Sequence, residues 1–246
     1  MPETALVVMA RYPQPGTTKT RLARMLGDET TLKLYRAFLI DLAGHFAGPE
    51  YDLHWTYTPA EVDYASFIRT LVPRLAHHTH SFPQQGADLG ERLLHAFRWT
   101  HRQGYRSTIV IGSDAPHITR EMIAQAGRAL QEVDVVLGPA DDGGYYLIAM
   151  REPHDVFSTI PMSTSVVAAR TIARADKLGL TTRLIQPLFD VDEYPDLLRL
   201  AELLRTNSAL APATAALIAN LRSIHDHDSL YTCDTARRHS AALDLS

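Results

Sequence analysis

LVVMARYPQPGTTKTR, residues 6–21, runs from a short apolar segment into a basic loop, and it decides the fold. Residues 6–10 are apolar, β-rich and followed at once by turn residues, which is typical of a buried parallel strand. Two prolines stiffen the loop, and Gly16 permits a positive φ or a close backbone approach. This stretch predicts a first strand that ends in a shaped loop.

Strands and helices alternate downstream of this first strand. Further strands are expected at 52–57, 108–112, 133–138 and 145–149, the last two around a Gly-Gly turn. Helices are expected from N-caps at Asp28, Asp88 and Thr119, and over 62–71. The alternation predicts a mostly parallel sheet with helices on both faces, a three-layer α/β/α fold. Ligands in such sheets bind at the carboxyl ends of the strands.

The rest of the chain extends the same domain. Helices are expected at 197–204 and 213–221, and the polar tail 223–246 lacks periodicity, which favours loose packing or disorder. We expect residues 1–205 to form the main body and residues 206–246 a helical extension and tail of one domain.

Composition excludes several classes of protein. Lys and Arg number 24 against 28 Asp and Glu, a net charge of -4, so no nucleic-acid partner is expected. No apolar run is long enough to span a bilayer, and the first residues lack the pattern of a signal peptide. The single cysteine, Cys233, cannot form an internal disulfide, which favours a cytoplasmic location. The histidines at 77, 78 and 80 lack the partners of a metal site.

The basic loop predicts an anion site. Arg11, Lys19 and Arg21 lie in one loop of an acidic protein, and the last two begin a helix whose free N–H groups favour anions. The loop matches neither GxxxxGK[ST] nor GxGxxG. A solvated basic turn is the alternative interpretation, and the position after the first strand favours the ligand site.

Two acidic elements predict a divalent metal site. Asp114 follows the apolar strand 108–112, and Asp190 and Asp192 follow a second apolar stretch and alternate to the same side. Carboxylate oxygens suit Mg²⁺ or Mn²⁺, which bridge the phosphates of a nucleotide. The alternatives are ordinary turn chemistry at Asp114 and helix entry at Asp192.

The turn GPADDGGYY, residues 138–146, combines glycines, two carboxylates and two phenols. A tight hairpin explains Asp-Gly-Gly alone. The additional Gly-Pro and the two tyrosines indicate a site for a hydroxylated acceptor.

Six segments together resemble one bacterial family, DUF2064, a glycosyltransferase-like group of the GT-A, nucleotide-diphospho-sugar transferase superfamily. These segments are ARYPQPGTTKTRLARMLG, QGADLGERL, IGSDAPHI, GPADDGGYYLIAM, IPMSTSVV and DVDEYPDL. They occur in order over about residues 5–205. The resemblance implies a GT-A, Rossmann-like fold and a transferase activity.

The residue patterns above and the resemblance together predict roles for individual residues; the resemblance itself implies the roles of Lys19, Arg21, Asp114, Asp190, Asp192, Gln85, Gly86 and Asp88. The nucleotide is expected at Arg11, Gly16, Lys19, Thr20, Arg21, Gln85, Gly86, Asp88 and Asp114, and the metal at Asp114, Asp192 and Asp190. The acceptor is expected at Asp141, Asp142, Gly143, Gly144, Tyr145, Tyr146 and Thr164, with Asp114, Asp142, Asp141 and Lys19 as catalytic residues. The chain departs from the family pattern at Arg11 (commonly lysine), at Met162 (a tryptophan) and at Pro195, which is shifted by one position.

The expected activity is metal-dependent transfer of a sugar from a nucleotide-diphospho-sugar to a small-molecule acceptor. One alternative is a nucleotidyltransferase that joins an NTP to a small phosphorylated acceptor and releases pyrophosphate. The other is a nucleotide sensor without catalysis.

Overall fold

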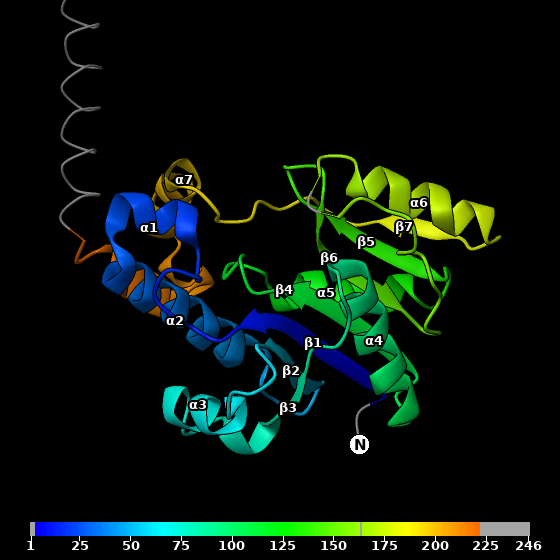
Figure 1. Cartoon of the computed structure of the whole chain (residues 1–246), viewed down its shortest axis with the longest axis horizontal. Helices are drawn as coiled ribbons and strands as arrows, with labels where there is room; N and C mark the ends of the chain where they lie inside the picture. The colour runs from blue at the N-terminus through cyan, green and yellow to red at the C-terminus, as the bar shows by residue number, and fades with distance from the viewer. Residues whose placement is uncertain (1–2, 163, 222–246) are drawn as a thin grey trace, which may run out of the picture.

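The computed structural model describes residues 3–162 and 164–221, which form a seven-stranded sheet between helices (Figure 1). Its strands are β1 (Thr4–Arg11), β2 (Asp52–Thr58), β3 (Thr79–Pro83), β4 (Ser107–Gly112), β5 (Val135–Pro139), β6 (Tyr145–Met150) and β7 (Thr182–Leu184). Its α-helices are α1 (Thr20–Leu26), α2 (Asp28–Phe46), α3 (Tyr64–Leu71), α4 (Leu89–Arg102), α5 (Arg120–Ala129), α6 (Val167–Lys177), α7 (Tyr194–Thr206) and α8 (Pro212–Ile218). Short 3₁₀ turns lie at Ala76–His78 and Ser208–Leu210.

The sheet is parallel except for one strand. Its order is β3-β2-β1-β4-β6-β5-β7, and β6 pairs antiparallel with both β4 and β5. The predicted three-layer, mostly parallel α/β fold is confirmed. Because β6 runs against its neighbours, its first residues lie at the edge where β1, β4 and β5 end.

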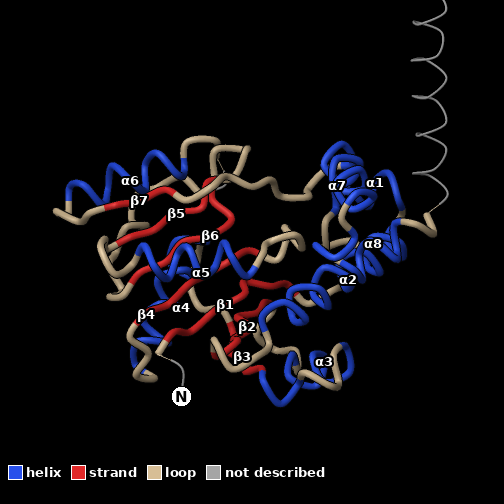
Figure 2. The backbone as a smooth tube through the Cα atoms, turned by 180° about the vertical axis from the view of Figure 1, so that it is seen from behind, coloured by secondary structure: helices blue, strands red, loops and turns tan. Residues whose placement is uncertain are grey.

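Side chains that alternate along the strands build a core on each face of the sheet. Leu6, Val8 and Ala10 of β1 face one core, which the apolar sides of α2, α3, α5, α7 and α8 complete. Ala5 and Val7 face the other core, which is covered by α4 and α6. Figure 2 shows α6 beside β5 and β7, and α3 beside β2 and β3 at the opposite end of the sheet. The period-two pattern thus assigns each strand residue to a layer.

Several local predictions are confirmed and others are wrong. Asp88 and Thr119 do cap α4 and α5, each accepting a hydrogen bond from the third helical N–H. Asp28, in contrast, lies inside α2, and Gly27 with φ 77° is its N-cap, because only glycine adopts this conformation readily. Strands β3 and β7 were not predicted, and β5 begins two residues later than predicted.

The C-terminal helix α8 packs against α2. Asp41 of α2 accepts hydrogen bonds from the Ala213 and Thr214 N–H groups and from the Thr214 hydroxyl, at 2.8, 2.9 and 2.6 Å. Ile218 belongs to the same core as α2. The predicted tail 223–246 lies outside the described residues, and the division of the chain at 205 stays a prediction. None of the helices in the described part is long and apolar enough to cross a membrane.

Candidate nucleotide-binding active site

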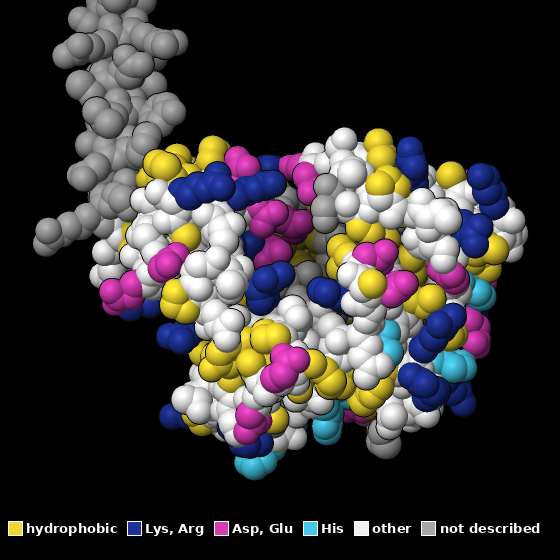
Figure 3. Space-filling model, viewed as in Figure 1, with side chains coloured by type: hydrophobic (Ala, Val, Ile, Leu, Met, Phe, Trp, Pro, Cys, Tyr) yellow, Lys and Arg dark blue, Asp and Glu magenta, His cyan; other side chains and the backbone are white. Residues whose placement is uncertain are grey.

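One cavity of about 870 Å³ opens at the carboxyl ends of β1 and β4. Of the predicted site residues, it is lined by Arg11, Lys19, Thr20, Arg21, Asp114, Asp142, Gly144, Tyr145, Tyr146, Thr164, Asp190 and Asp192. Figure 3 shows acidic side chains gathered above the hollow, with basic side chains on its lower side. The strand-end rule therefore brings residues more than 170 positions apart to one place.

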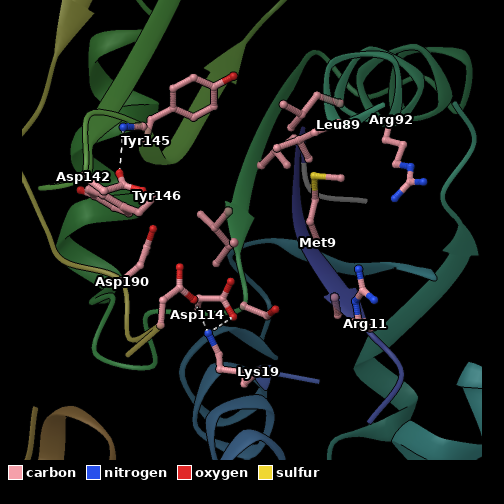
Figure 4. Close-up of a pocket in the computed structure, with 18 of the residues that line it drawn as sticks. Met9, Arg11, Lys19, Leu89, Arg92, Asp114, Asp142, Tyr145, Tyr146 and Asp190 are labelled. Carbon is pink, nitrogen blue, oxygen red and sulfur yellow. Dashed lines mark hydrogen bonds and ion pairs between the residues drawn. The ribbon is translucent and has the colours of Figure 1, made fainter. Parts of the chain in front are cut away.

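Lys19 joins the two acidic elements (Figure 4). Its ammonium Nζ lies 2.6 Å from Asp114 Oδ1 and 2.8 Å from Asp192 Oδ1, and only 5% of its side chain is exposed. Burial alone would lower the pKa of Lys19, but the two carboxylates outweigh it and raise the pKa above its usual value. Lys19 is therefore a fixed positive charge between them.

The backbone of Lys19 is left-handed, with φ 47° and ψ 51°, at the N-cap of α1. A non-glycine residue adopts this conformation at a cost of about 1 kcal/mol or more, and such residues cluster at functional sites. The conformation turns the chain from the loop into α1, and the ion pairs with Asp114 and Asp192 compensate for it.

The segment that carries the second acidic element is tied to β4 and to α7. The Val191 N–H donates to the Asp114 carbonyl at 2.9 Å. The Asp196 carboxylate in the first turn of α7 accepts hydrogen bonds from the N–H groups of Asp192 and Glu193, at 3.1 and 2.8 Å. The helix therefore begins at Tyr194 despite the shifted proline, and it fixes the backbone of Asp192.

Asp190 adds a third carboxylate to this end of the cavity. Its pKa is raised to about 7, first by burial and then by the negative charges of Asp114 and Asp192, which together outweigh the opposing effect of Lys19. Asp114 and Asp192 alone carry more negative charge than one ammonium neutralises, and this excess attracts a cation.

The carboxylates around Lys19 offer oxygen ligands for a divalent metal. No three His, Cys, Asp or Glu side chains within residues 3–162 and 164–221 come together as a complete metal site. Mg²⁺ in nucleotide sites needs only one or two carboxylates, since waters and substrate phosphates supply its other oxygens. Asp114 and Asp192 fit that requirement, and the metal site stays a prediction.

The glycine-rich turn divides its two carboxylates between different surroundings. Asp142 lines the cavity, and its Oδ1 accepts a hydrogen bond from the Gly144 N–H at 2.8 Å. Asp141 lies outside the lining, where it forms an ion pair with Arg199 of α7 at 2.6 Å. Arg199 also lies over the ring of Phe189, with its Cζ 3.9 Å from the ring centroid. Only Asp142 is therefore placed to meet a substrate.

The other residues of this turn shape the cavity wall. Tyr145 and Tyr146 line it, and the Tyr146 hydroxyl donates to the Gln186 carbonyl at 3.0 Å. Gly143, with φ 87°, lies outside the lining, and a Cβ here would overlap the backbone of Ser165. Gly143 thus serves close packing against the loop that carries Thr164. Met162, the family's tryptophan position, packs against α4 at Gly90, away from the lining.

The residues of the basic loop have different roles at the cavity. The Tyr35 hydroxyl accepts a hydrogen bond from the Arg11 N–H at 3.0 Å and bonds the Ser113 hydroxyl at 2.9 Å, which ties the end of β1 to α2. Arg21 forms an exposed ion pair with Glu193 at 3.2 Å. Gly16, with φ 70°, lies outside the lining and serves the turn alone.

The QGAD segment, residues 85–88, lies beside the cavity, and neighbouring residues that the sequence did not indicate line the cavity instead. Gln85, Gly86 and Asp88 lie outside the lining, whereas Gln84 lines it. The Gln84 amide donates to the carbonyls of Ala10 and Thr56, at 3.2 and 3.0 Å, and so joins the ends of β1 and β2. Other unpredicted lining residues include Met9, Tyr35, Leu89 and Arg92. Arg92 follows Asp88 by four residues. This spacing places two side chains on the same face of a helix, so the prediction at Asp88 could have been extended to Arg92.

Comparisons with known proteins identify the family and the fold of the chain. Residues 49–164 match the family described as "Uncharacterized protein conserved in bacteria (DUF2064)". A crystal structure of a candidate nucleotide-diphospho-sugar transferase from Desulfovibrio desulfuricans G20 is 32% identical, with a TM-score of 0.83 over 91% of this chain and 97% of that one.

Two further relatives are more distant. A phosphoenolpyruvate guanylyltransferase of Chloroflexus aggregans (strain MD-66 / DSM 9485) is 32% identical over 116 residues, 45% of this chain and 55% of that protein. The match thus spans about half the length of this curated relative. The structure of 4-diphosphocytidyl-2C-methyl-D-erythritol synthase from Anaerococcus prevotii DSM 20548 shares the fold, with a TM-score of 0.54 at 8% identity over 82% of this chain and 98% of that one.

Proposed function

Because this chain belongs to the DUF2064 family and has the fold of the nucleotide-diphospho-sugar transferases, we propose that it transfers a sugar from a nucleotide-diphospho-sugar to a hydroxylated small molecule. One observation carries the proposal. A single cavity holds the Asp114–Lys19–Asp192 group together with the carboxylate of Asp142. The groups proposed to bind phosphate and to accept a proton thus face the same space.

The donor's diphosphate is proposed to lie beside Lys19. A divalent cation held by Asp114 and Asp192 would supply charge neutralisation to the leaving nucleoside diphosphate. Lys19 supplies a positive charge that is already desolvated and oriented, the condition under which electrostatic stabilisation is strongest. Tyr35 and Ser113 hold the end of β1 that supports this loop.

The acceptor is proposed to lie beside Asp142. Its carboxylate takes the proton from the acceptor hydroxyl as the acceptor oxygen bonds to the anomeric carbon of the donor. The bond from that carbon to the phosphate oxygen breaks, and the nucleoside diphosphate leaves with the electron pair. Tyr145 and Tyr146 form the wall that positions the acceptor. Positioned acid–base groups of this kind contribute about 10²–10⁴-fold to the rate.

Nucleotidyl transfer is the second candidate, supported by the guanylyltransferase relative. In that reaction the acceptor oxygen attacks the α-phosphorus of an NTP, and pyrophosphate leaves. The same carboxylates and lysine serve either reaction, because both develop negative charge on a phosphate leaving group.

The released product distinguishes the candidates. The protein is incubated with a panel of nucleotide-sugars and NTPs in Mn²⁺, with hydroxylated and phosphorylated acceptors. Nucleoside diphosphate release supports sugar transfer, and pyrophosphate release supports nucleotidyl transfer. Binding without turnover of any donor would contradict both and leave the nucleotide sensor.

Two neighbouring carboxylates provide a matched control for the acceptor role. We expect Asp142→Asn to lower the rate by about 10²-fold or more and Asp141→Asn to have a much smaller effect. Equal losses in both variants would contradict the role given to Asp142, since Asp141 faces Arg199 instead of the cavity.

A further inference from the structure

Two arginines form a basic wall opposite the acidic residues of the cavity. Arg11 at the end of β1 and Arg92 in the first turns of α4 both line the cavity. In Figure 4 both guanidinium groups lie on the side away from Asp114 and Asp190, the side that also carries Met9 and Leu89. Within the described part of the chain, neither guanidinium forms an ion pair with a carboxylate.

The QGAD segment holds Arg92 in place. The Arg92 Nε–H donates to the Gly86 carbonyl at 3.1 Å, which leaves the terminal nitrogens for another partner. Gly86 has φ 137°, and a Cβ here would lie 2.6 Å from Glu91 Cβ and 2.8 Å from the backbone nitrogen of Arg92. Glycine is therefore required for the close approach that aims its carbonyl at Arg92.

The flanking residues make this support rigid. Asp88 accepts a hydrogen bond from the Glu91 N–H at 2.9 Å, and Glu91 accepts one from the Ala87 N–H at 2.8 Å. Gln85, Gly86 and Asp88 do not reach the cavity themselves, so the segment acts there through Arg92.

We propose that Arg11 and Arg92 form an anion subsite, separate from the carboxylate group, that binds a phosphate of the donor nucleotide without a metal ion. A planar guanidinium binds a phosphate through two parallel hydrogen bonds, and a fixed one loses less entropy when it binds. Unpaired positive charge inside a concave site of a protein with net charge -4 further favours an anion. The nucleotide identity of the occupant rests on the proposed function, whereas the anion preference rests on the arginines alone.

The test measures metal-free binding of inorganic tripolyphosphate. Calorimetric titrations in EDTA compare the unsubstituted protein with Arg11→Ala and Arg92→Ala. Each variant should bind at least about 10-fold more weakly, since a charge-assisted hydrogen bond contributes about 1.5–3 kcal/mol. Arg92→Lys should recover part of the affinity, because lysine keeps the charge and loses the planar fork.

Arg102→Ala is the matched control. Arg102 lies on the same helix, and its Nε–H also donates to a backbone carbonyl, that of Arg98, at 3.2 Å, but outside the cavity lining. This variant should bind tripolyphosphate as the unsubstituted protein does. Thermal unfolding of all variants in the absence of ligand verifies that they are folded.

Undiminished tripolyphosphate binding by folded Arg92→Ala would overturn the subsite. So would equally tight binding of malonate, since the subsite would then accept any anion and not a phosphate in particular. Loss of binding in Arg11→Ala and Arg92→Ala, with no nucleotide turned over by the unsubstituted protein, would support the subsite and refute the proposed function.

Discussion

Replacing Lys19 by methionine should destabilise the metal-free protein and enlarge the stabilisation that Mn²⁺ confers. Methionine matches lysine as far as Cε and lacks only the ammonium, and at either residue the left-handed backbone conformation carries a similar cost. The substitution therefore removes mainly the charge. Asp114, Asp190 and Asp192 then face one another without the ammonium that now lies 2.6 and 2.8 Å from two of them. A divalent cation would no longer compete with the Lys19 ammonium for the carboxylates.

The cost follows from the surroundings of the ion pairs. Removing one partner of a fully buried pair costs about 3–5 kcal/mol. Lys19 is buried, but the side chains of Asp114 and Asp192 are 42% and 49% exposed, so water screens part of the loss. We therefore expect a loss of about 2 kcal/mol, or about 4–8 °C in Tm for a chain of this size.

Thermal unfolding in EDTA and in Mn²⁺ measures both effects. Lys33→Met is the control, because Lys33 forms an exposed pair with Glu29 at 2.7 Å, and water screens such a pair so that it contributes little to stability. Unchanged Tm of Lys19→Met in EDTA, or a Mn²⁺-induced shift no larger than that of the unsubstituted protein, would refute the reasoning.

Three further predictions concern stability. Asp41→Ala should lower the free energy of unfolding in urea by about 1–3 kcal/mol, because three donors at the start of α8 lose their acceptor; an unchanged value would contradict this cap. Burial lowers the pKa of His54 and of His117 to about 4, so folded protein keeps them neutral while unfolded chains protonate below about pH 6.5. Stability should therefore fall from pH 6.5 towards pH 4, by up to about 3 kcal/mol for each histidine, and a His54→Gln, His117→Gln variant should show a shallower fall; identical slopes would count against it. Gly143→Ala should lower Tm more than Gly179→Ala, since both glycines have positive φ but only at Gly143 would a Cβ overlap neighbouring backbone; equal Tm changes would contradict the packing argument.

The sequence predicts the interior of the fold better than its edges. Strands β1 and β4 are apolar runs with clear ends, so their positions are confirmed. Strand β3 (THSFP) and strand β7 (TRL) lie at the two edges of the sheet, where Phe82 is their only buried residue, so they carry little apolar signal. The insertion of β6 between β4 and β5 depends on pairing between distant segments, which no local pattern contains.

The candidate site could be located from the sequence, but its details could not. Strand ends share one edge of the sheet, so Arg11, Asp114 and Asp142 were predicted to meet, and they line one cavity. Which of two adjacent residues faces that cavity depends on backbone angles, and this separates Asp142 from Asp141. The roles assigned to all of these residues stay predictions.

Two contacts could not be predicted from any pattern in the sequence. The bridge from Lys19 to Asp192 joins residues 173 positions apart. The support of Arg92 by the Gly86 carbonyl depends on a backbone conformation with φ 137°. The sequence motif indicates Gly86 but not the arginine to which its carbonyl is hydrogen-bonded.

Asp114 and Asp192 are proposed to hold a divalent cation against the phosphates of a nucleotide donor. Calorimetric titration of a donor found in the nucleotide panel, in Mn²⁺ and in EDTA, tests this proposal most directly. We expect Mn²⁺ to tighten donor binding by at least about 10-fold and Asp114→Asn to remove this gain. Equal affinity for the donor in Mn²⁺ and in EDTA would contradict the proposal, and so would an Asp114→Asn variant that keeps the full gain from Mn²⁺.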